Sequence, residues 1–274
     1  MKSDLKICFI GGGNMATALI GGLAGKLTNA ANIHVVDPNA DALAKLALQF
    51  GVATSEKVDA DIGVVDVIVL AVKPQQMKEV AALLAPHIGA QLVLSIAAGI
   101  RAADLSRWLN GHQAIVRSMP NTPALIGQGI AGMVAMAGVT AEQRDIADAI
   151  LRSVGATVWL DDEALIDPVT AVSGSGPAYV FYFIEAMQQA AQELGLTPEQ
   201  GTQLAIATFT GASQLAAQAS EPIAVLRERV TSKGGTTYAA LASMDASGVK
   251  DGIVRALHAA AQRGKELGDE FGRN

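Results

Sequence analysis

The strongest constraint in this sequence is a change of hydrophobic pattern near residue 163. Before it, short apolar runs rich in β-branched residues alternate with amphipathic segments, which is typical of a parallel sheet flanked by helices. After it, these runs disappear and an alanine-rich helical period takes over. The sequence therefore predicts a Rossmann-like, doubly wound α/β domain over residues 1–162. An all-α C-terminal domain is expected over residues 163–274.

Seven strands and six helices are expected. The strands are Leu5–Ile10, Ile33–Asp37, Val67–Val72, Leu92–Ile96, Ala114–Ser118, Ile130–Met136 and Thr157–Leu160. The helices lie at 163–173, 177–194, 198–218, 222–230, 236–246 and 249–270. Gly195 is typical of a helix C-terminus, and Thr197 with Gln200 predicts a capping box at the next helix.

The composition excludes several classes of partner. Half of the 274 residues are apolar, which suffices for a large core. A formal net charge of −6 with scattered basic residues argues against nucleic acid. The charge-free stretch 201–220 is diluted by polar residues and is a poor membrane span. We expect a protein that binds neither nucleic acid nor membrane and holds no metal.

The single cysteine, Cys8, excludes an internal disulfide, and its apolar neighbours predict a buried thiol. This cysteine usage fits a reducing compartment. The sequence passes from residues 1–4 directly into a predicted strand, which leaves no room for an export signal. A cytoplasmic protein is therefore expected.

A glycine cluster, GGGNMA, lies between the first predicted strand and the helix that follows it. In this context the pattern predicts dinucleotide binding. Gly11 would make the tight turn, Gly13 would let the backbone approach a pyrophosphate, and Ala16 would let the helix lie close to the sheet. Asn14 and Met15 would supply the first amides of the helix, whose positive end favours phosphate.

Asp37 ends the second predicted strand. An acidic residue at this place binds the ribose hydroxyls of NAD and repels the 2′-phosphate of NADP. No arginine or lysine occurs in residues 38–44 to offset that repulsion, and Lys45 lies one helical turn farther on. Taken alone, Asp37 favours NADH.

Further cofactor contacts are expected where other strands end, because ligands of such sheets bind outside the carboxyl ends of the strands. Lys73, next to Pro74, would face phosphate or ribose, although a solvated strand end is the alternative interpretation. Ala97 and Ala98 would leave room for the flat nicotinamide, and Asn121 would bond its amide.

A dinucleotide site implies hydride transfer, yet no general base stands out. An alcohol substrate would need such a base, and none of the four histidines lies in a glycine-rich segment. A cyclic imine can be protonated by solvent near neutral pH, so a hydroxyl hydrogen bond to its nitrogen would suffice. The sequence therefore favours an imine substrate.

The stretch VTSKGGTT, residues 230–237, joins two predicted helices. Gly234 and Gly235 free the backbone, and the amides from Gly235 to Thr237 begin the next helix, which makes a candidate carboxylate site. Each charge-assisted bond there is worth roughly 1.5–3 kcal/mol. The hydroxyl of Thr237 would face the ring nitrogen. A well-capped helix junction without a ligand is the alternative.

Six motifs together resemble pyrroline-5-carboxylate reductase over essentially the whole chain. They are FIGGGNMATAL, AVKPQ, SIAAGI, MPNTPA, SGSGPAYVF and PIAVLRERVTSKGGTTYAALASMD, of which the last is the most specific. The resemblance implies reduction of 1-pyrroline-5-carboxylate to L-proline with NAD(P)H, the last step of proline biosynthesis. It also implies an intertwined homodimer formed through the helical domain, often assembled into a homodecamer of five dimers.

The resemblance also assigns site residues. Cofactor contacts are expected at Gly12, Asn14, Met15, Val72, Lys73 and Ala98. Substrate contacts are expected at Ser232, Gly234, Gly235, Thr236 and Thr237, with Glu163 and Ser175 as weaker candidates. Relatives that prefer NADPH often carry a small hydroxyl residue at the position of Asp37. The resemblance implies NADP(H) as the cofactor, and Asp37 makes NAD(H) the alternative. Arg229 receives no role.

Two rival functions predict different features. A β-hydroxyacid dehydrogenase shares the N-terminal fingerprint but uses a helix-borne lysine in its second domain, and no lysine occurs between Lys78 and Lys233. A dinucleotide-sensing protein without turnover would not need the turn at residues 230–237. The residues thus favour the reductase.

Overall fold

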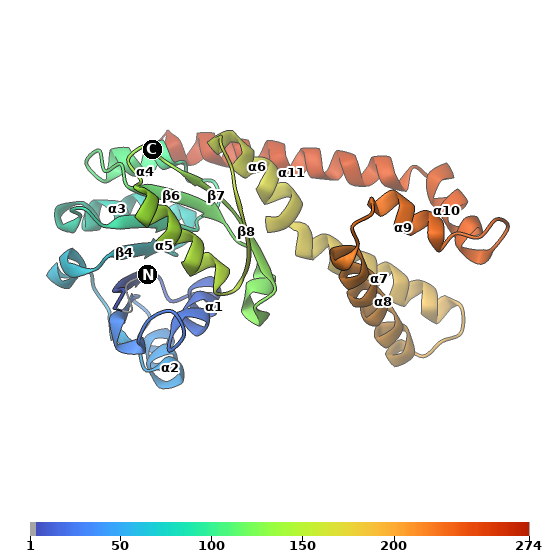
Figure 1. Cartoon of the computed structure of the whole chain (residues 1–274), viewed down its shortest axis with the longest axis horizontal. Helices are drawn as coiled ribbons and strands as arrows, with labels where there is room; N and C mark the ends of the chain where they lie inside the picture. Colours follow the sequence, from blue (N-terminus) through green and yellow to red (C-terminus); the bar gives the residue numbers. More distant parts are fainter. Residues whose placement is uncertain (1–3, 274) are drawn as a thin grey trace. The chain divides into compact units, whose positions relative to one another are not determined.

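An eight-stranded sheet in the order β3-β2-β1-β4-β5-β6-β7-β8 organises the first part of the chain (Figure 1). The computed structural model describes residues 4–273, apart from the side chains of residues 60 and 61. The strands are β1 (Ile7–Ile10), β2 (Ile33–Val36), β3 (Ala53–Ser55), β4 (Val67–Leu70), β5 (Leu92–Ser95), β6 (Ile115–Met119), β7 (Gly129–Ala135) and β8 (Gly155–Trp159). All seven predicted strands are confirmed within two residues at each end, and β3 is an additional strand.

The sheet is parallel except at one pair, because β7 runs antiparallel to β6. A parallel crossover needs about a dozen residues or more. The connection from Met119 to Gly129, which holds the 3-10 helix η5 (Thr122–Ile126), is shorter than that. The expectation of a wholly parallel sheet is therefore corrected at this pair.

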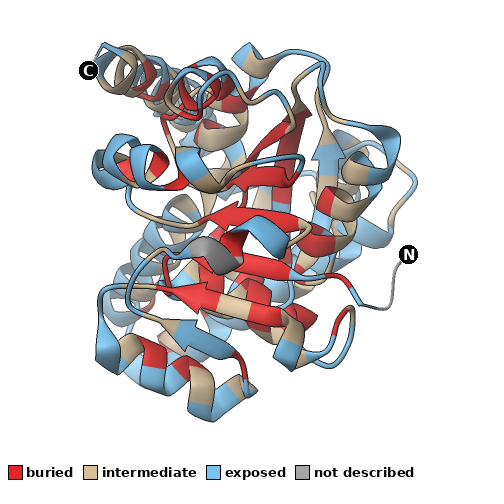
Figure 2. Ribbon diagram, turned by 90° about the vertical axis from the view of Figure 1, so that its left-hand side faces the viewer, coloured by how far each residue is buried: buried red, intermediate tan, exposed pale blue. Residues whose placement is uncertain are grey.

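Helices cover both faces of the sheet. On one face α1 (Asn14–Leu23), α2 (Ala40–Phe50) and α5 (Ala141–Arg152) share a buried apolar cluster with alternate strand residues. On the other face α3 (Met77–Leu84) and α4 (Ala102–Trp108) share a second cluster. Strands β1, β4 and β5 are buried along their whole length, as the red centre of Figure 2 shows. The doubly wound α/β class is confirmed.

Short helical turns complete the connections between these elements. The 3-10 helices are η1 (Ala30–Asn32), η2 (Ala60–Val64), η3 (Pro74–Gln76), η4 (Ala85–His87), η5 and η6 (Glu163–Leu165). After η6 come α6 (Ile166–Val169) and a turn of π-helix, η7 (Thr170–Gly174).

The remaining elements are helices, as the alanine-rich period predicts. They are α7 (Gly176–Glu193), α8 (Pro198–Gln218), α9 (Ile223–Arg229), α10 (Thr236–Ala246) and α11 (Val249–Gly272). Gly195 adopts φ +94° after α7. The predicted capping box is present at α8, where Thr197 and Gln200 exchange backbone and side-chain bonds of 3.0 and 3.3 Å. Ring contact between Phe183 and Phe209 joins α7 to α8.

The chain divides into two compact units that differ from the predicted division at residue 163. The sheet unit comprises residues up to Ser175 together with 259 onward, and the helical unit comprises Gly176–His258. Residues 163–175 join the sheet unit because they pack on it. Ile166 is buried, and Val169 fills the space beside Gly132 of β7, where a Cβ atom would lie 2.7 Å from Val169 Cγ1.

Among the helices of the described residues, none is both long enough and apolar enough to cross a membrane.

Candidate active site

The glycine turn after β1 has the geometry that its residue types predict. Gly11 adopts φ +103°, and a Cβ atom there would lie only 2.7 Å from the carbonyl oxygen of Ala71. Its amide donates to the carbonyl of Val36 at 2.8 Å. The tight turn predicted at Gly11 is thus confirmed, and the backbone conformation excludes a side chain.

Open space lies beside Gly13, the last glycine of this turn. Gly13 caps α1 without a side-chain bond, and no atom lies within 4 Å of the place where its Cβ would be. Within the described chain, the amides of Asn14 and Met15 find no acceptor. Ala16 is 1% exposed, so α1 lies close against the sheet. A helix start with free amides and positive potential suits a phosphate group.

Asp37 is fixed beside this turn by two backbone bonds. Its Oδ2 accepts from the amide of Gly12 at 2.7 Å, and its Oδ1 accepts from the amide of Asn39 at 2.8 Å. Asn39 caps α2 by accepting from the amide of Ala42. The carboxylate therefore links the glycine turn to the start of α2.

The strand ends predicted to hold the cofactor lie in register. Ile10, Leu70 and Ser95 are neighbours across β1, β4 and β5, so the segments that follow them share one edge of the sheet. These segments supply Val72, exposed Lys73 and Pro74 after β4, and buried Ala97 and half-buried Ala98 after β5. We call the carboxyl ends of β1, β2, β4 and β5 the cofactor edge.

Both polar groups of the Asn121 side chain already bond to the protein backbone. Its side chain is buried, its Nδ2 donates to the carbonyl of Ser173 at 3.1 Å, and its Oδ1 accepts from the amide of Ile130 at 3.0 Å. It thereby ties β7 to the π-helical turn η7. The contact with a nicotinamide amide stays a prediction.

Glu163 pairs with an arginine that the sequence analysis does not single out. Its Oε1 accepts from Arg117 Nη1 at 2.8 Å and from the amide of Ala102 at 2.7 Å, which places its charge at the start of α4. The Arg117 side chain is only 4% exposed, and Asp167 Oδ1 lies 3.9 Å from its Nη2. A charge inside the apolar run of β6 is the signal that could have marked this residue.

Burial also acts on the third member of this group. Desolvation raises the pKa of Asp167, which the charges of Arg117 and Arg101 oppose. Ser175, the other weak substrate candidate, is half-buried, and its amide donates to the carbonyl of Thr170 at 2.8 Å. Substrate contacts by Glu163 and Ser175 stay predictions.

The turn at residues 230–237, here called the substrate turn, belongs to the helical unit. Gly234 adopts φ +73°, and the amide of Gly235 donates to the carbonyl of Ser232 at 3.0 Å. A Cβ atom on Gly235 would lie 2.6 Å from Ser232 Oγ, so a larger residue there would displace the Ser232 side chain. Ser232 and Thr236 are exposed, whereas Thr237 is half-buried.

The free amides of this turn begin one residue later than the sequence predicts. Gly235 caps α10 without a side-chain bond, and its own amide is already used. Within the described residues, the amides of Thr236, Thr237 and Tyr238 have no acceptor. Three such donors at the start of an 11-residue helix can bind a carboxylate.

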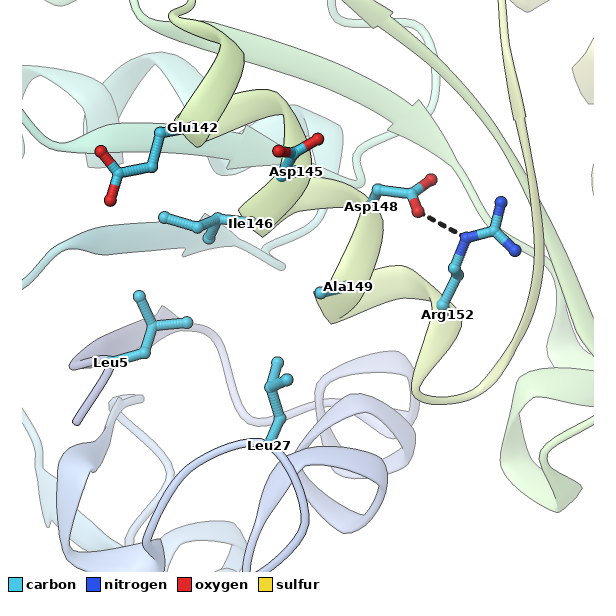
Figure 3. Close-up of a pocket in the computed structure, with 8 residues that line it drawn as sticks. All are labelled: Leu5, Leu27, Glu142, Asp145, Ile146, Asp148, Ala149 and Arg152. Atoms are coloured by element: carbon cyan, nitrogen blue, oxygen red, sulfur yellow. Dashed lines mark hydrogen bonds and ion pairs between the residues drawn. The ribbon is translucent and has the colours of Figure 1, made fainter. Parts of the chain in front are cut away.

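A pocket elsewhere on the sheet unit contains none of the predicted site residues (Figure 3). It is lined by Leu5, Leu27, Glu142, Asp145, Ile146, Asp148, Ala149 and Arg152. Asp148 pairs with Arg152 and accepts from Thr157 Oγ1 at 2.8 Å and from the Trp159 indole at 3.1 Å. These bonds serve the packing of α5 on β8.

Comparison with known proteins decides the family. A curated pyrroline-5-carboxylate reductase of Pseudomonas aeruginosa is 48% identical over 98% of this chain and 99% of its own length. The chain belongs to the pyrroline-5-carboxylate reductase family. A family model described as pyrroline-5-carboxylate reductase dimerisation matches residues 163–267. A second, described as NADP oxidoreductase, coenzyme F420-dependent, matches residues 6–99.

Solved structures agree with this membership. A pyrroline-5-carboxylate reductase from Coxiella burnetii is 38% identical with a TM-score of 0.90, covering 96% of this chain and 98% of that one. The Plasmodium falciparum enzyme, whose structure has NADP bound, is 28% identical with a TM-score of 0.86, covering 97% and 99%. The fold and family expected from the sequence are confirmed, and this reductase is an oxidoreductase that acts on a CH–NH group.

Proposed function

We propose that the cofactor edge and the substrate turn carry the reduction of 1-pyrroline-5-carboxylate to L-proline. As a pyrroline-5-carboxylate reductase, the chain catalyses this reduction in proline biosynthesis and uses a nicotinamide cofactor. The observation that supports the roles of these two places is a pair of helix starts with unused amides, one at α1 and one at α10.

The α1 start and its surroundings suit the dinucleotide. The amides of Asn14 and Met15 would hold the pyrophosphate above Gly13, where the structure has open space. Lys73 would add a positive charge beside phosphate or ribose. The small residues Ala97 and Ala98 would leave room for the nicotinamide ring. When bound, the cofactor supplies a hydride to the imine carbon.

Asp37 supports NADH as the preferred form. Its carboxylate is fixed by two amides and so cannot easily turn away from a 2′-phosphate. Residues 38–44 supply no cation to offset the repulsion. NADPH is the alternative, and the NADP-bound Plasmodium relative supports it.

The α10 start suits the imino acid. The amides of Thr236, Thr237 and Tyr238 would hold the substrate carboxylate, each bond contributing roughly 1.5–3 kcal/mol. The Thr237 hydroxyl would bond the ring nitrogen and keep the protonated imine oriented. Gly234, with its positive φ, lets the backbone adopt the required turn, and Ser232 lies beside Gly235.

Exposed side chains of the helical unit support the proposal that the chain assembles through its predicted C-terminal domain, residues 163–274. Large apolar side chains are exposed on it, namely Val180, Phe181, Tyr182, Met187, Leu204, Ile206, Leu215, Ile223, Tyr238, Met244, Ile253 and Val254. Burial of such a surface against a second copy would remove it from water. A homodimer is therefore proposed, with a homodecamer as the further assembly, and light scattering distinguishes two from ten chains. A cytoplasmic location is proposed from the single buried thiol.

Initial rates with pyrroline-5-carboxylate, measured with NADH and NADPH in parallel, test the function. We expect oxidation of the cofactor with both forms and the higher kcat/KM with NADH. Dinucleotide binding without any oxidation in the presence of the imine would instead indicate a sensing protein.

A further inference from the structure

The last turns of α11 return to the sheet unit with a glycine at every fourth position. Gly264, Gly268 and Gly272 lie on one face of the helix because residues four apart are neighbours on a helical surface. We call residues 264–272 the C-terminal brace.

Each of these glycines makes room for a charged side chain of the sheet unit. A Cβ atom on Gly268 would lie 3.0 Å from Arg101 Nε, and one on Gly272 would lie 2.6 Å from Asp104 Oδ2. One on Gly264 would lie 3.5 Å from Asp167. The glycines therefore let these side chains lie directly on the helix backbone.

Hydrogen bonds also join the brace to the sheet unit. Arg101 donates to Asp269 Oδ1 at 2.6 Å, and Arg107 donates to the carbonyl of Gly272 at 2.9 Å. Arg101 is the residue that precedes α4, and Ala102 begins that helix. The brace is thus bonded to the end of the segment that leads from β5 to α4.

Two apolar side chains of the brace pack against Gly99, in the middle of the segment that leads from β5 to α4. Gly99 is buried and adopts φ +71°. A Cβ atom on it would lie 3.1 Å from Leu267 Cβ and 3.2 Å from Phe271 Cδ2. Phe271 also packs on the buried apolar cluster below α3 and α4. The side chains of Leu267 and Phe271 thus pack against the segment 97–101 at Gly99.

This segment has little other support from its own backbone. Within the described chain, the amides of Ala98 and Gly99 have no acceptor, and the amide of Ala97 reaches Ser95 Oγ only at 3.4 Å. A glycine with positive φ has the greatest backbone freedom of any residue. Packing must therefore supply the order that hydrogen bonds do not.

We propose that Leu267 and Phe271 are positioning residues for the cofactor. By pressing on Gly99 they hold residues 97–101 in the conformation that leaves room for the nicotinamide ring at Ala97 and Ala98. This inference rests on the proposed function, which places the nicotinamide there. The brace contacts described above lie at residues 99–107 and at Asp167, outside the glycine turn that would hold the adenosine side, so we expect the adenosine side not to depend on them.

Direct titration of the full-length wild type and of Phe271→Ala tests the inference. The ligands are NADH and ADP-ribose, which lacks the nicotinamide. We expect the Kd of NADH to rise about tenfold and that of ADP-ribose to change less than about twofold. Leu267→Ala should behave in the same way, and Phe271→Leu should restore most of the NADH affinity. Hydrogen exchange of the peptide over residues 96–102 should become faster in Phe271→Ala.

Phe50→Ala is the matched control. Phe50 also ends a helix and is partly buried, but it packs on Gly21 of α1 in the other apolar cluster. It should leave both dissociation constants and the exchange of residues 96–102 unchanged. Equal weakening of NADH and ADP-ribose by Phe271→Ala, or no change in either, overturns the inference. If Phe271→Ala fails to fold, Leu267→Ala decides by the same ratio. A wild type that binds NADH without oxidising it contradicts the proposed function and leaves this ratio measurable.

Discussion

The carboxylate of Asp37 accepts a hydrogen bond of 2.7 Å from the amide of Gly12, so the acid that we propose to bind the ribose is tied to the glycine turn. A second bond from Asn39 fixes the other oxygen at 2.8 Å. A substitution at this position therefore changes two properties, namely the charge that meets a 2′-phosphate and the bond that supports the turn. Two variants separate them.

Asp37→Asn removes the charge and keeps one oxygen, which can accept from Gly12 but leaves the amide of Asn39 facing an NH2 group. Asp37→Ser removes the charge and both carboxylate oxygens. We expect the ratio of kcat/KM for NADPH over NADH to rise about tenfold in both variants, since repulsion of one phosphate is lost. Both variants should also lose stability, Asp37→Asn by roughly 1 kcal/mol for one missing bond and Asp37→Ser by more, because it loses both bonds. An unchanged cofactor ratio in both variants would show that Asp37 does not meet the ribose.

Substitution by alanine should have different effects at Gly11 and Gly13. It should lower stability at Gly11 and weaken cofactor binding at Gly13. At Gly11 a methyl group meets the Ala71 carbonyl at 2.7 Å with φ +103°, so Gly11→Ala should lower the free energy of unfolding by more than about 1 kcal/mol. At Gly13 the space is open and the helix start tolerates a side chain. Gly13→Ala should fold normally but bind NADH about tenfold more weakly, because the methyl group occupies the path of the pyrophosphate. Thermal unfolding and NADH titration of both variants check the contrast.

The sequence predicts most of this fold because its apolar periods are long and its helix boundaries carry capping residues. It fails at β3, since Ala53-Thr54-Ser55 is a short, largely exposed edge strand without a hydrophobic alternation. Strand β7 is predicted, but its antiparallel direction is not, because the direction of a strand depends on the length of its connection rather than on its own residues.

The candidate site is predictable where function depends on local backbone. Gly11, Gly13 and the turn at residues 230–237 carry their signal in adjacent residues. Contacts between distant residues carry no such signal. Glu163 meets Ala102 across 61 positions in the chain, and Gly99 meets Phe271 only in the folded protein.

Glu163 offers a test between a structural role and substrate contact. Glu163→Ala leaves the nearly buried Arg117 without its nearest carboxylate, so it should lower the free energy of unfolding by roughly 1.5–3 kcal/mol. Glu163→Gln retains an oxygen that accepts from Arg117 and Ala102, so it should lose less. If the role is structural, the KM for pyrroline-5-carboxylate stays the same in Glu163→Gln. A KM that rises about tenfold or more in this variant would instead show substrate contact.

Cys8 should be inert in the folded protein. Its side chain is fully buried in β1, and desolvation, followed by the charge of Asp59, raises the pKa of the thiol to about 12. The thiolate that reacts with iodoacetamide is therefore almost absent at pH 8. We expect labelling, followed by mass spectrometry, only after denaturation, and no change with cofactor. Rapid labelling of the native protein at pH 8 would contradict the burial.

Thr237 has two proposed functions that substitution can separate, because its amide belongs to the backbone and its hydroxyl to the side chain. Thr237→Val keeps the amide and the shape but removes the hydroxyl, so it should lower kcat or raise the KM for pyrroline-5-carboxylate about tenfold, the equivalent of about 1.4 kcal/mol. Thr237→Ser retains the hydroxyl and should keep most of the activity. The NADH dissociation constant should stay the same in both variants, since α10 contributes no residue to the cofactor edge. Equal kcat and KM of Thr237→Val and the wild type would reject a bond from this hydroxyl to the ring nitrogen. A loss of activity in Thr237→Ser as large as that in Thr237→Val would indicate that the methyl group matters instead.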